Sequence, residues 1–305
     1  MCRRRRAPDP LRVRLAPLFT APAAVPAPSG PAPTVSPLPA PAHGTVGARD
    51  AIGVLGGLGP YAGLDLVRTL FDETDAHADQ EHLPVALVSY PGRIPDRSTW
   101  IADASAPSPV PPMLAVLHAL DAAGCAVVGV PCNTAHAPVL FDALRAGLAG
   151  TPMRLLHIVD AIVAAIEREM PTVRRVGVLA TDSSVANRLH QIGLEASGRE
   201  ALVPDAAVQA RVHASIFDAT WGLKAHSAPP DPRARTVLLD AVAHLVAHGA
   251  EAVILGCTEL PLAVPERVYA GVPLVNSTRA LAQALILATH PEKLRTSAES
   301  IGVAV

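Results

Sequence analysis

Short apolar runs alternate along the chain with longer segments that mix apolar and polar residues. The short runs are typical of strands buried on both faces, and the longer segments are typical of helices with one buried face. From residue 51 onward the runs predict strands at 51–55, 84–89, 125–130, 176–180 and 252–255. The other segments predict helices at 61–75, 111–123, 138–148, 158–169 and 236–248. This alternation predicts an α/β fold, with mainly parallel sheets flanked by helices.

The pattern also repeats within the chain. The run Ile52-Gly-Val-Leu55 is echoed by Val176-Gly-Val-Leu179. Cys132, which ends a later apolar run, lies 78 residues after Val54. Cys257, which ends another such run, lies 79 residues after Val178. We infer two similar lobes, related by a pseudo-twofold axis, whose cysteine-bearing strand ends face one cleft. Open α/β sheets bind ligands at such strand ends.

Residues 1–48 differ from the rest, because eleven prolines fall within the first 41 positions. Such a composition predicts a disordered, Pro/Ala-rich extension, since proline cannot sustain a helix or a strand ladder. The basic run Arg3 to Arg6 precedes apolar residues and weakly resembles an export signal, but Pro17 interrupts the apolar stretch. A disordered extension or a misassigned start codon is the favoured interpretation.

Composition limits the classes of function. Apolar residues make up 50% of the 305 positions, and the net charge of −2 gives no electrostatic basis for binding nucleic acid. No apolar stretch reaches 18 residues, so the sequence predicts no membrane span. The four cysteines form no C-x-x-C pair and are too few for a disulfide scaffold. Together these features predict a reduced, cytoplasmic protein whose partner is a small molecule.

Two of the cysteines stand in matching contexts. Cys132 and Cys257 each follow a predicted buried strand, and each precedes a small amide or hydroxyl residue that could cap a helix. A thiol beside a helix N-terminus is expected to have a low pKa. A thiolate and a thiol facing one cleft can serve as base and acid on opposite faces of a carbon acid. The alternative is that both are small core residues, but the matched pair favours catalysis.

Polar residues near these cysteines are candidates for holding a substrate carboxylate. Asn133, Thr134 and Thr258 offer amide and hydroxyl donors beside helix N-termini. Arg97 lies in a polar loop after a predicted strand, and an arginine there could clamp a distal carboxylate bidentately. Lys224 is one of only two lysines in the chain, and we expect it to contact a substrate carboxylate.

A glycine-rich turn follows the first predicted strand. Gly57-Leu-Gly-Pro-Tyr-Ala62 fits the G-x-G-x-x-A pattern of dinucleotide-binding folds, but acidic residues follow sooner than a ribose-binding acid does. A tight turn over a substrate pocket explains the glycines equally well and makes Gly57 a candidate pocket residue.

Cofactor and metal sites find less support in the sequence. Pyridoxal phosphate needs a Schiff-base lysine, and no Gly/Ser cluster for its phosphate accompanies Lys224. His244 and His248 have the spacing of metal ligands on a helix, but they fall opposite its apolar face and no third ligand is evident. The sequence therefore predicts neither a cofactor nor a metal.

Five segments of the chain resemble the cofactor-independent aspartate/glutamate racemases. These segments, which span about residues 50–285, are Gly53–Pro60, Ile94–Arg97, Pro131–His136, Phe217–Ala225 and Gly256–Leu260. The resemblance implies an active site between two similar α/β lobes. The first lobe would comprise residues 49–157 completed by 277–305, and the second would comprise 158–276.

The resemblance also implies a mechanism. Cys132 and Cys257 would act on opposite faces of Cα, without a cofactor, in a homodimer. The substrate carboxylates would be held by a set of polar residues, namely Asn133, Thr134, Thr258, Arg97 and Lys224. The opening Gly56-Gly-Leu-Gly-Pro60 is similar to the aspartate racemase branch, whereas glutamate racemases open with Asp-Ser-Gly.

Two positions depart from the family pattern. Ser183-Ser184 stands where a Gly-Thr pair is usual, and Asn276 stands where Asp is common. Both departures could alter substrate recognition. Aspartate racemisation is the leading prediction. The alternatives are a racemase of glutamate or of broader specificity, a maleate-type cis-trans isomerase, and a small-acid binding protein with inert cysteines.

Overall fold

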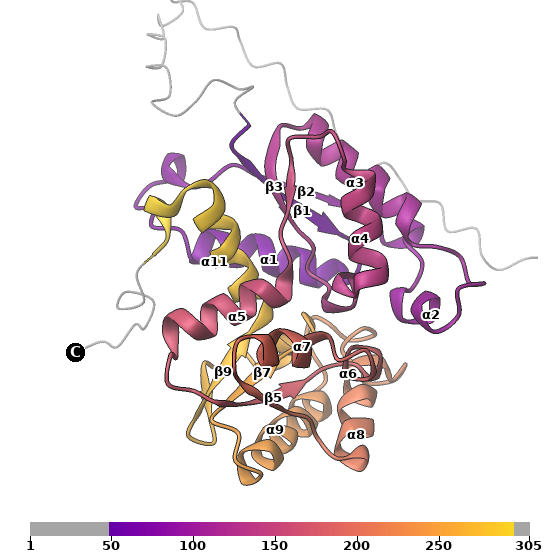
Figure 1. Ribbon diagram of the computed structural model, residues 1–305, viewed down its shortest axis with the longest axis vertical. Coiled ribbons are helices and arrows are strands. Elements are labelled where there is room, and N and C mark those ends of the chain that lie inside the picture. The colour runs from indigo at the N-terminus through magenta and orange to yellow at the C-terminus, as the bar shows by residue number, and fades with distance from the viewer. Residues whose placement is uncertain (1–48, 296–305) are drawn as a thin grey trace, which may run out of the picture. The chain divides into compact units, whose positions relative to one another are not determined.

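The structure of the protein, a computed structural model, describes residues 49–295 (Figure 1). The predictions made for residues 1–48 therefore lie outside the described residues. The first sheet contains four parallel strands in the order β2-β1-β3-β4. These are β1 (Ala51–Gly56), β2 (Val85–Ser89), β3 (Cys125–Gly129) and β4 (Arg154–Leu155). The accompanying helices are α1 (Pro60–Asp72), α2 (Arg97–Ala102), α3 (Val110–Ala122) and α4 (Pro138–Gly147).

The second sheet contains five strands in the order β6-β5-β7-β9-β8, of which only β8 is antiparallel to its neighbour. These are β5 (Arg175–Leu179), β6 (Glu200–Leu202), β7 (Ala252–Leu255), β8 (Val268–Tyr269) and β9 (Val272–Asn276). The remaining helices are α5 (Ile158–Glu169), α6 (Asp182–Ala186), α7 (Leu189–Ala196), α8 (Ala206–Phe217), α9 (Pro232–Ala247), α10 (Leu260–Ala263) and α11 (Ser277–Thr289). Within residues 49–295, no helix has the length and apolar character needed to cross a bilayer.

The two sheets share one strand order. In each, the first strand lies between the second and the third, and a later parallel strand flanks the third. The cysteine-bearing strands β3 and β7 are thus equivalent inner strands, as the internal repeat predicted. The predicted fold class is confirmed, because both sheets are mainly parallel and flanked by helices (Figure 1).

Two observed helices begin or end at other residues than predicted, one because of a local cap and one because of a long-range contact. Helix α9 begins at Pro232, earlier than the predicted residue 236, because the Asp231 carboxylate accepts a hydrogen bond from the Arg233 amide at 2.8 Å. Aspartate before proline is a helix start signal. Helix α1 ends at Asp72, before the predicted residue 75, and Thr74 instead forms a bridge with Leu294.

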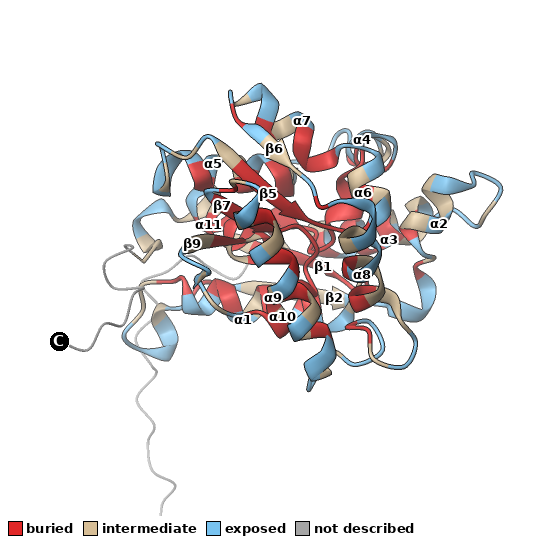
Figure 2. Cartoon of the chain, turned by 90° about the horizontal axis from the view of Figure 1, so that it is seen from below, coloured by how far each residue is buried: buried red, intermediate tan, exposed pale blue. Residues whose placement is uncertain are grey.

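A continuous apolar core runs through both sheets. Ile162 of α5 and Leu281 of α11 are fully buried in one cluster with Val54 of β1 and Ile254 of β7. Figure 2 shows the buried strands at the centre, with the exposed surface on the helices and loops around them. Helices α5 and α11 pack against each other and contribute to this shared core. No gap in the core therefore marks a boundary between lobes, and the predicted lobe boundaries stay a prediction.

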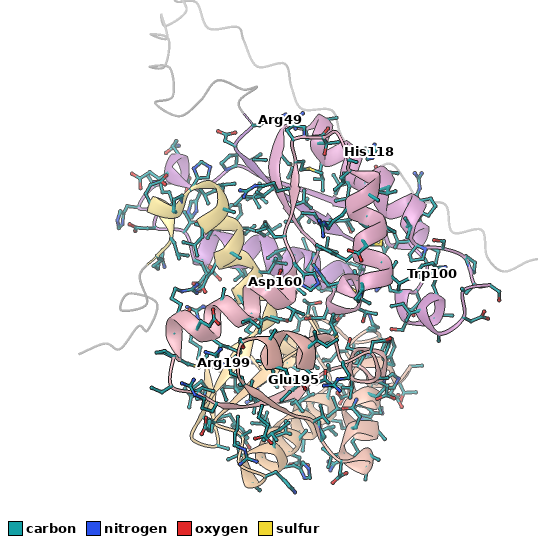
Figure 3. The ribbon with its side chains drawn as sticks, viewed as in Figure 1. Arg49, Trp100, His118, Asp160, Glu195 and Arg199 are labelled. Atoms are coloured by element: carbon teal, nitrogen blue, oxygen red, sulfur yellow. The ribbon has the colours of Figure 1, made fainter. Side chains whose placement is uncertain are left out.

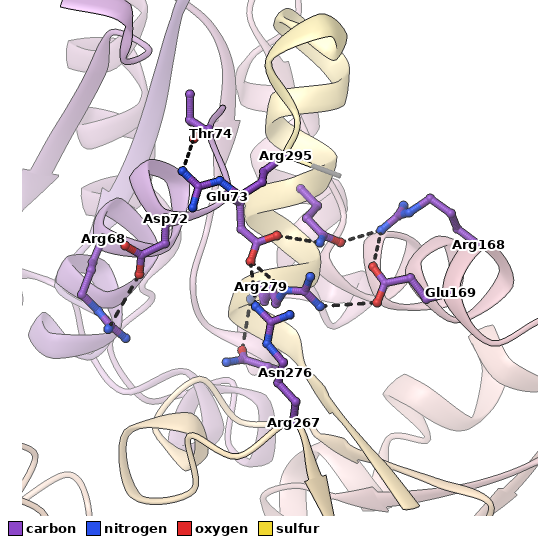
Figure 4. A network of polar contacts seen from close by, with 11 residues as sticks. Arg68, Asp72, Glu73, Thr74, Arg168, Glu169, Arg267, Asn276, Arg279 and Arg295 are labelled. Carbon is purple, nitrogen blue, oxygen red and sulfur yellow. Dashed lines mark hydrogen bonds and ion pairs between the residues drawn. The ribbon is translucent and has the colours of Figure 1, made fainter. Parts of the chain in front are cut away.

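An ion-pair network joins α1, α5, α11 and the loop before β8 (Figure 4). Glu73 is buried and accepts hydrogen bonds from Arg279 Nε at 2.7 Å and from Gln283 Nε2 at 2.8 Å. Arg267 Nη2 lies 3.5 Å from the same carboxylate. The adjoining cavity of about 670 Å³ has four arginines and four carboxylates in its walls. Its charges therefore compensate one another, and the network holds the helices together.

Candidate active site

The two predicted cysteines lie at one cavity. Cys132 follows β3 and Cys257 follows β7, each at the carboxyl end of an inner parallel strand. Both are free thiols, 8% and 7% exposed. The walls of the cavity include every predicted site residue except Gly57, namely Cys132, Cys257, Asn133, Thr134, Thr258, Arg97 and Lys224.

The cavity is nearly closed. Its volume is about 10 Å³, which is close to the minimum that holds one water molecule. An amino acid does not fit this space. Ligand binding therefore requires the walls to move apart.

Glu259 links a thiol to a cation within this cavity. Cys257 Sγ donates a hydrogen bond to Glu259 Oε2 at 2.9 Å, and Lys224 Nζ pairs with Glu259 Oε1 at 3.1 Å. The Glu259 side chain is 4% exposed, so these partners replace the water that a carboxylate would otherwise bind. Burial lowers the pKa of Lys224, but Glu259 and the two cysteine sulfurs outweigh it and raise the pKa above its ordinary value. Lys224 is therefore a fixed cation beside Cys257.

The expected low pKa at Cys257 is wrong. Burial raises the pKa of this thiol well above its ordinary value, and the Glu259 carboxylate raises it further. Lys224 opposes that effect but does not overcome it. The predicted helix caps are also absent, since Thr258 donates its hydroxyl elsewhere and the 3-10 helix Asn133–His136 begins without a side-chain cap. Both elements that follow the cysteines are short, which limits any helix dipole.

Arg97 stands beside the other thiol. It is buried, and its Nη2 donates to the Leu58 carbonyl at 2.6 Å. Burial lowers the pKa of Arg97, but the Cys132 sulfur and the Asp96 carboxylate raise it above its ordinary value. The Arg97 Nε atom has no hydrogen-bond partner. Arg97 thus brings a fixed positive charge to the side of the cavity that holds Cys132.

The glycine-rich turn shapes the cavity without Gly57 lining it. Gly57 has a φ of 89°, and a Cβ there would lie 2.9 Å from the backbone of Pro91. A Cβ on Gly59 would lie 2.3 Å from Glu259 Oε1. Together with the Leu58 carbonyl that holds Arg97, the turn positions one cation and one carboxylate of the site.

The residues expected to hold a substrate carboxylate make hydrogen bonds between segments of the two sheets. Thr258 Oγ1 donates to the Pro131 carbonyl at 2.9 Å. Asn133 Nδ2 donates to Ser277 Oγ at 3.3 Å, and the Thr134 and Ser184 hydroxyls lie 3.5 Å apart. These bonds hold the closed form. A carboxylate in the cavity would compete with them for the same donors.

Two buried histidines support the loop after β3, and sequence reasoning did not identify them. His136 Nε2 lies 3.0 Å from the Val130 carbonyl, and its Nδ1 accepts from the Ile158 amide at 3.2 Å. His190 Nε2 lies 3.0 Å from Asn133 Oδ1. Burial, reinforced by His157, lowers the pKa of His136 to about 3 and that of His190 to about 4. Both rings are therefore neutral near pH 7.

The remaining lining residues were not predicted as site residues, although three of them lie in segments that carry the family resemblance. They are Asp96, Ser98, Thr181, Phe217 and Glu259. Asp96 caps α2 by accepting from the Thr99 amide at 2.9 Å. The Lys224 ammonium lies 5.4 Å from the centre of the Phe217 ring. Asp96, Phe217 and Glu259 carried a usable signal, because each lies in one of the motif segments.

The two histidines at the end of α9, His244 and His248, contact each other. Within residues 49–295, no three His, Cys, Asp or Glu side chains form a group that could hold a metal ion. His248 is exposed, and its Nδ1 lies 2.7 Å from the His244 carbonyl. The two rings pack against each other with centres 4.2 Å apart.

The two departures from the family pattern occupy well-defined positions. Ser184 is buried, and its hydroxyl accepts from Thr181 Oγ1 at 3.0 Å. Asn276 caps α11 by accepting from the Arg279 amide at 3.1 Å. Asparagine and aspartate cap helices about equally well. The change at Asn276 therefore preserves the local structure.

Comparison with known proteins identifies the family of the chain. Residues 55–285 match the Asp/Glu/Hydantoin racemase family. The chain belongs to this family. Its fold resembles that of an aspartate racemase from Picrophilus torridus, with a TM-score of 0.67 and 25% identity over 82% of this chain and 97% of that one.

Two further family structures share the fold. An aspartate racemase homologue from Pyrococcus horikoshii OT3 has a TM-score of 0.61 and 21% identity, over 79% of this chain and 99% of that one. A glutamate racemase from Campylobacter jejuni subsp. jejuni has a TM-score of 0.51 and 19% identity, over 79% of this chain and 86% of that one. The resemblance inferred from the motifs is thus confirmed.

Proposed function

We propose that the protein is a cofactor-independent racemase of aspartate, with Cys132 and Cys257 acting on opposite faces of Cα. The observation that carries this proposal is that two free thiols from equivalent strands line one cavity. Inversion of a carbon acid needs a base on one face and an acid on the other. A single thiol supplies only one of these groups.

The surroundings suggest the starting roles. Cys257 is the acid, because its Sγ carries the proton donated to Glu259. Cys132 is then the base, because two-base inversion leaves that role to the second thiol and the Arg97 cation stands next to it. In the reaction the Cys132 thiolate removes the α-proton, and the Cys257 thiol delivers its own proton to the other face. The product leaves a Cys132 thiol and a Cys257 thiolate. This exchanged form can act on the opposite enantiomer.

Two fixed cations suggest a substrate with two carboxylates. Arg97 and Lys224 both line the cavity, and each retains its positive charge near pH 7. The charge that develops on the α-carboxylate during proton removal is stabilised by donors already in place. The choice of aspartate over glutamate rests on the glycine-rich opening Gly56–Pro60, which is similar to the aspartate racemase branch.

Substrate binding must open the closed form. A carboxylate that reaches Thr258 and Asn133 would replace the hydrogen bonds to Pro131 and Ser277. A second carboxylate could replace Glu259 at Lys224. The lost protein contacts are thereby exchanged for contacts with the substrate.

The proposal is tested by incubation with L-aspartate, and separately L-glutamate, in deuterated water. We expect α-deuterium incorporation and loss of optical activity with aspartate, and slower exchange with glutamate. NMR and chiral chromatography measure the two effects. If neither amino acid exchanges its α-proton, the assignment is wrong.

Cysteine variants separate the two-base mechanism from simpler ones. Cys132→Ser and Cys257→Ser should each lower racemisation by roughly a hundredfold or more. Cys125→Ser is the matched control, because Cys125 is an equally buried free thiol in β3 that does not line the cavity. An active single variant at Cys132 or Cys257 would contradict the proposed mechanism.

A further inference from the structure

His190 joins the two cysteine loops. It is the second residue of α7 and is 1% exposed. Its Nε2 lies 3.0 Å from the amide oxygen of Asn133, the residue after Cys132. A side chain with so little exposure and one directed hydrogen bond has a fixed position.

The same ring lies against the other loop. A Cβ placed on Gly256, the residue before Cys257, would lie 2.9 Å from both Cε1 and Nε2 of His190. Gly256 is itself fixed, because its amide donates to the Leu179 carbonyl at 2.7 Å. One imidazole therefore contacts the residues adjacent to both thiols. Thr258, through Pro131, is the other direct link between these loops.

The neutral His190 ring carries one N–H proton, and the geometry indicates which of its two nitrogens holds it. The His190 Nδ1 atom is buried without a hydrogen-bond partner. A buried N–H without an acceptor is rarer than an acceptor without a donor. The proton therefore belongs on Nε2, which donates to Asn133 Oδ1. Because burial and His157 lower the pKa of His190 to about 4, the ring keeps this single proton near pH 7.

This bond determines how Asn133 faces the cavity. With Oδ1 bound to His190, the amide nitrogen of Asn133, which lines the cavity, donates to Ser277 Oγ at 3.3 Å and is the group left for a carboxylate. An amide nitrogen attracts a carboxylate, whereas the flipped amide would present a carbonyl oxygen that repels it. Shape alone scarcely distinguishes the two orientations, because the oxygen and nitrogen are similar in size.

We propose that His190 is a positioning residue that holds the Asn133 amide with its donor toward the substrate carboxylate and keeps the two cysteine loops in register. This inference rests on the proposed function, since it assigns the carboxylate as the group that Asn133 meets. His190 itself needs no contact with the substrate.

Two substitutions separate this role from simple packing. His190→Phe keeps a ring against Gly256 but removes the donor. His190→Gln places an amide near the Nε2 position and restores a donor, although it fills the ring space less well. Loss of a buried hydrogen bond predicts that His190→Phe raises the KM for aspartate roughly tenfold or more, with a smaller effect on kcat. His190→Gln should recover most of that loss.

The relative activities of the two variants distinguish a positioning role from a packing role. A positioning role requires His190→Gln to be more active than His190→Phe, even where the Tm of the Phe variant is higher. A packing role gives the reverse order, with activity following Tm, and would overturn the proposal. His118→Phe is the control, since His118 is an exposed histidine on α3 (Figure 3). Its KM should equal that of the unaltered protein.

A second measurement needs no substrate. Nitrogen-15 NMR of the full chain, with the His190 signals assigned by their absence from the Phe variant, should show a proton on Nε2 and none on Nδ1. Asn133→Ala should shift the Nε2 signal. A proton on Nδ1, or no shift in the Asn133 variant, would overturn the proposal. If aspartate proves not to be a substrate, these signals still test the His190–Asn133 bond.

Discussion

Cys257 Sγ and Glu259 Oε2 are 2.9 Å apart, and the thiol donates to the carboxylate. The pair explains why this cysteine differs from the reactive thiol that its strand-end position predicted. Burial disfavours the thiolate, and a carboxylate at this distance repels it. The protein therefore keeps Cys257 protonated until a ligand or a proton acceptor changes its surroundings.

Glu259→Gln should make Cys257 more reactive. The substitution removes the negative charge that raises the pKa of the thiol, while burial stays the same. The pH at which iodoacetamide alkylates Cys257 should therefore fall, as measured by mass spectrometry of the peptide that contains it. Cys132 in the same sample serves as the internal control. An unchanged or higher pH midpoint for Cys257 would show that Glu259 does not control its protonation.

Lys224→Met should have the opposite effect on the same thiol. Lys224 lowers the pKa of Cys257, and it is also the cation that pairs with Glu259. Without it the pKa of Cys257 should rise further, and alkylation should require higher pH. Lys224→Arg keeps the charge and should lie closer to the unaltered protein. Equal pH midpoints for Cys257 alkylation in Lys224→Met and Lys224→Arg would contradict an electrostatic role of Lys224.

Gly59→Ala should displace Glu259 without straining the backbone. The φ of Gly59 is 167°, which any residue adopts, but the new methyl group would lie 2.3 Å from Glu259 Oε1. We expect loss of racemisation by about tenfold or more, together with altered alkylation of Cys257. Gly92→Ala is the matched control, because no atom lies within 4 Å of its added Cβ. Full activity of the Gly59 variant would mean that Glu259 moves aside at little cost.

The sequence predicted the fold and the cysteine pair because both depend on local pattern. Apolar runs and their spacing identify the inner strands, and the residues that follow a strand reach the same sheet edge. The segments at 51–55 and 252–255 thus matched β1 and β7 closely. The protonation of Cys257 could not be read in this way, because it depends on burial and on the side-chain conformation of Glu259.

The supporting residues were beyond sequence reasoning for a similar reason. His190 and Asn133 are 57 positions apart and meet only in the tertiary structure. Asn133 and Ser277 are 144 positions apart. A single sequence contains no signal for such contacts, whereas a cap such as Asp231 lies beside the helix it starts. Gly57 is the converse case, since its motif predicts a pocket residue, whereas the structure places it in the tight turn beside Pro91.

Glu73→Gln should destabilise the protein. The Glu73 side chain is 4% exposed, and in the variant Arg279 loses the negative charge of its partner at 2.7 Å. Removing one member of a buried ion pair costs about 3 kcal/mol. Urea unfolding followed by circular dichroism measures this loss. Asp72→Asn is the control, because Asp72 is largely exposed and lies 3.8 Å from Arg68, so its change should be below about 1 kcal/mol.

The buried histidines should make stability depend on pH. His136 and His190 have pKa values of about 3 and about 4 in the folded protein, below the ordinary value of 6.5. The unfolded chain therefore binds more protons between these values, and the stability present above pH 6.5 is lost as pH falls toward the folded pKa values. Each histidine should contribute about 1.4 kcal/mol per pH unit within that window. Urea unfolding at pH 7, 6 and 5 measures the slope. His190→Gln should reduce this pH dependence of stability, and the control His118→Phe should not. If His190→Gln leaves the slope unchanged, the His190 ring does not stay neutral in the folded protein.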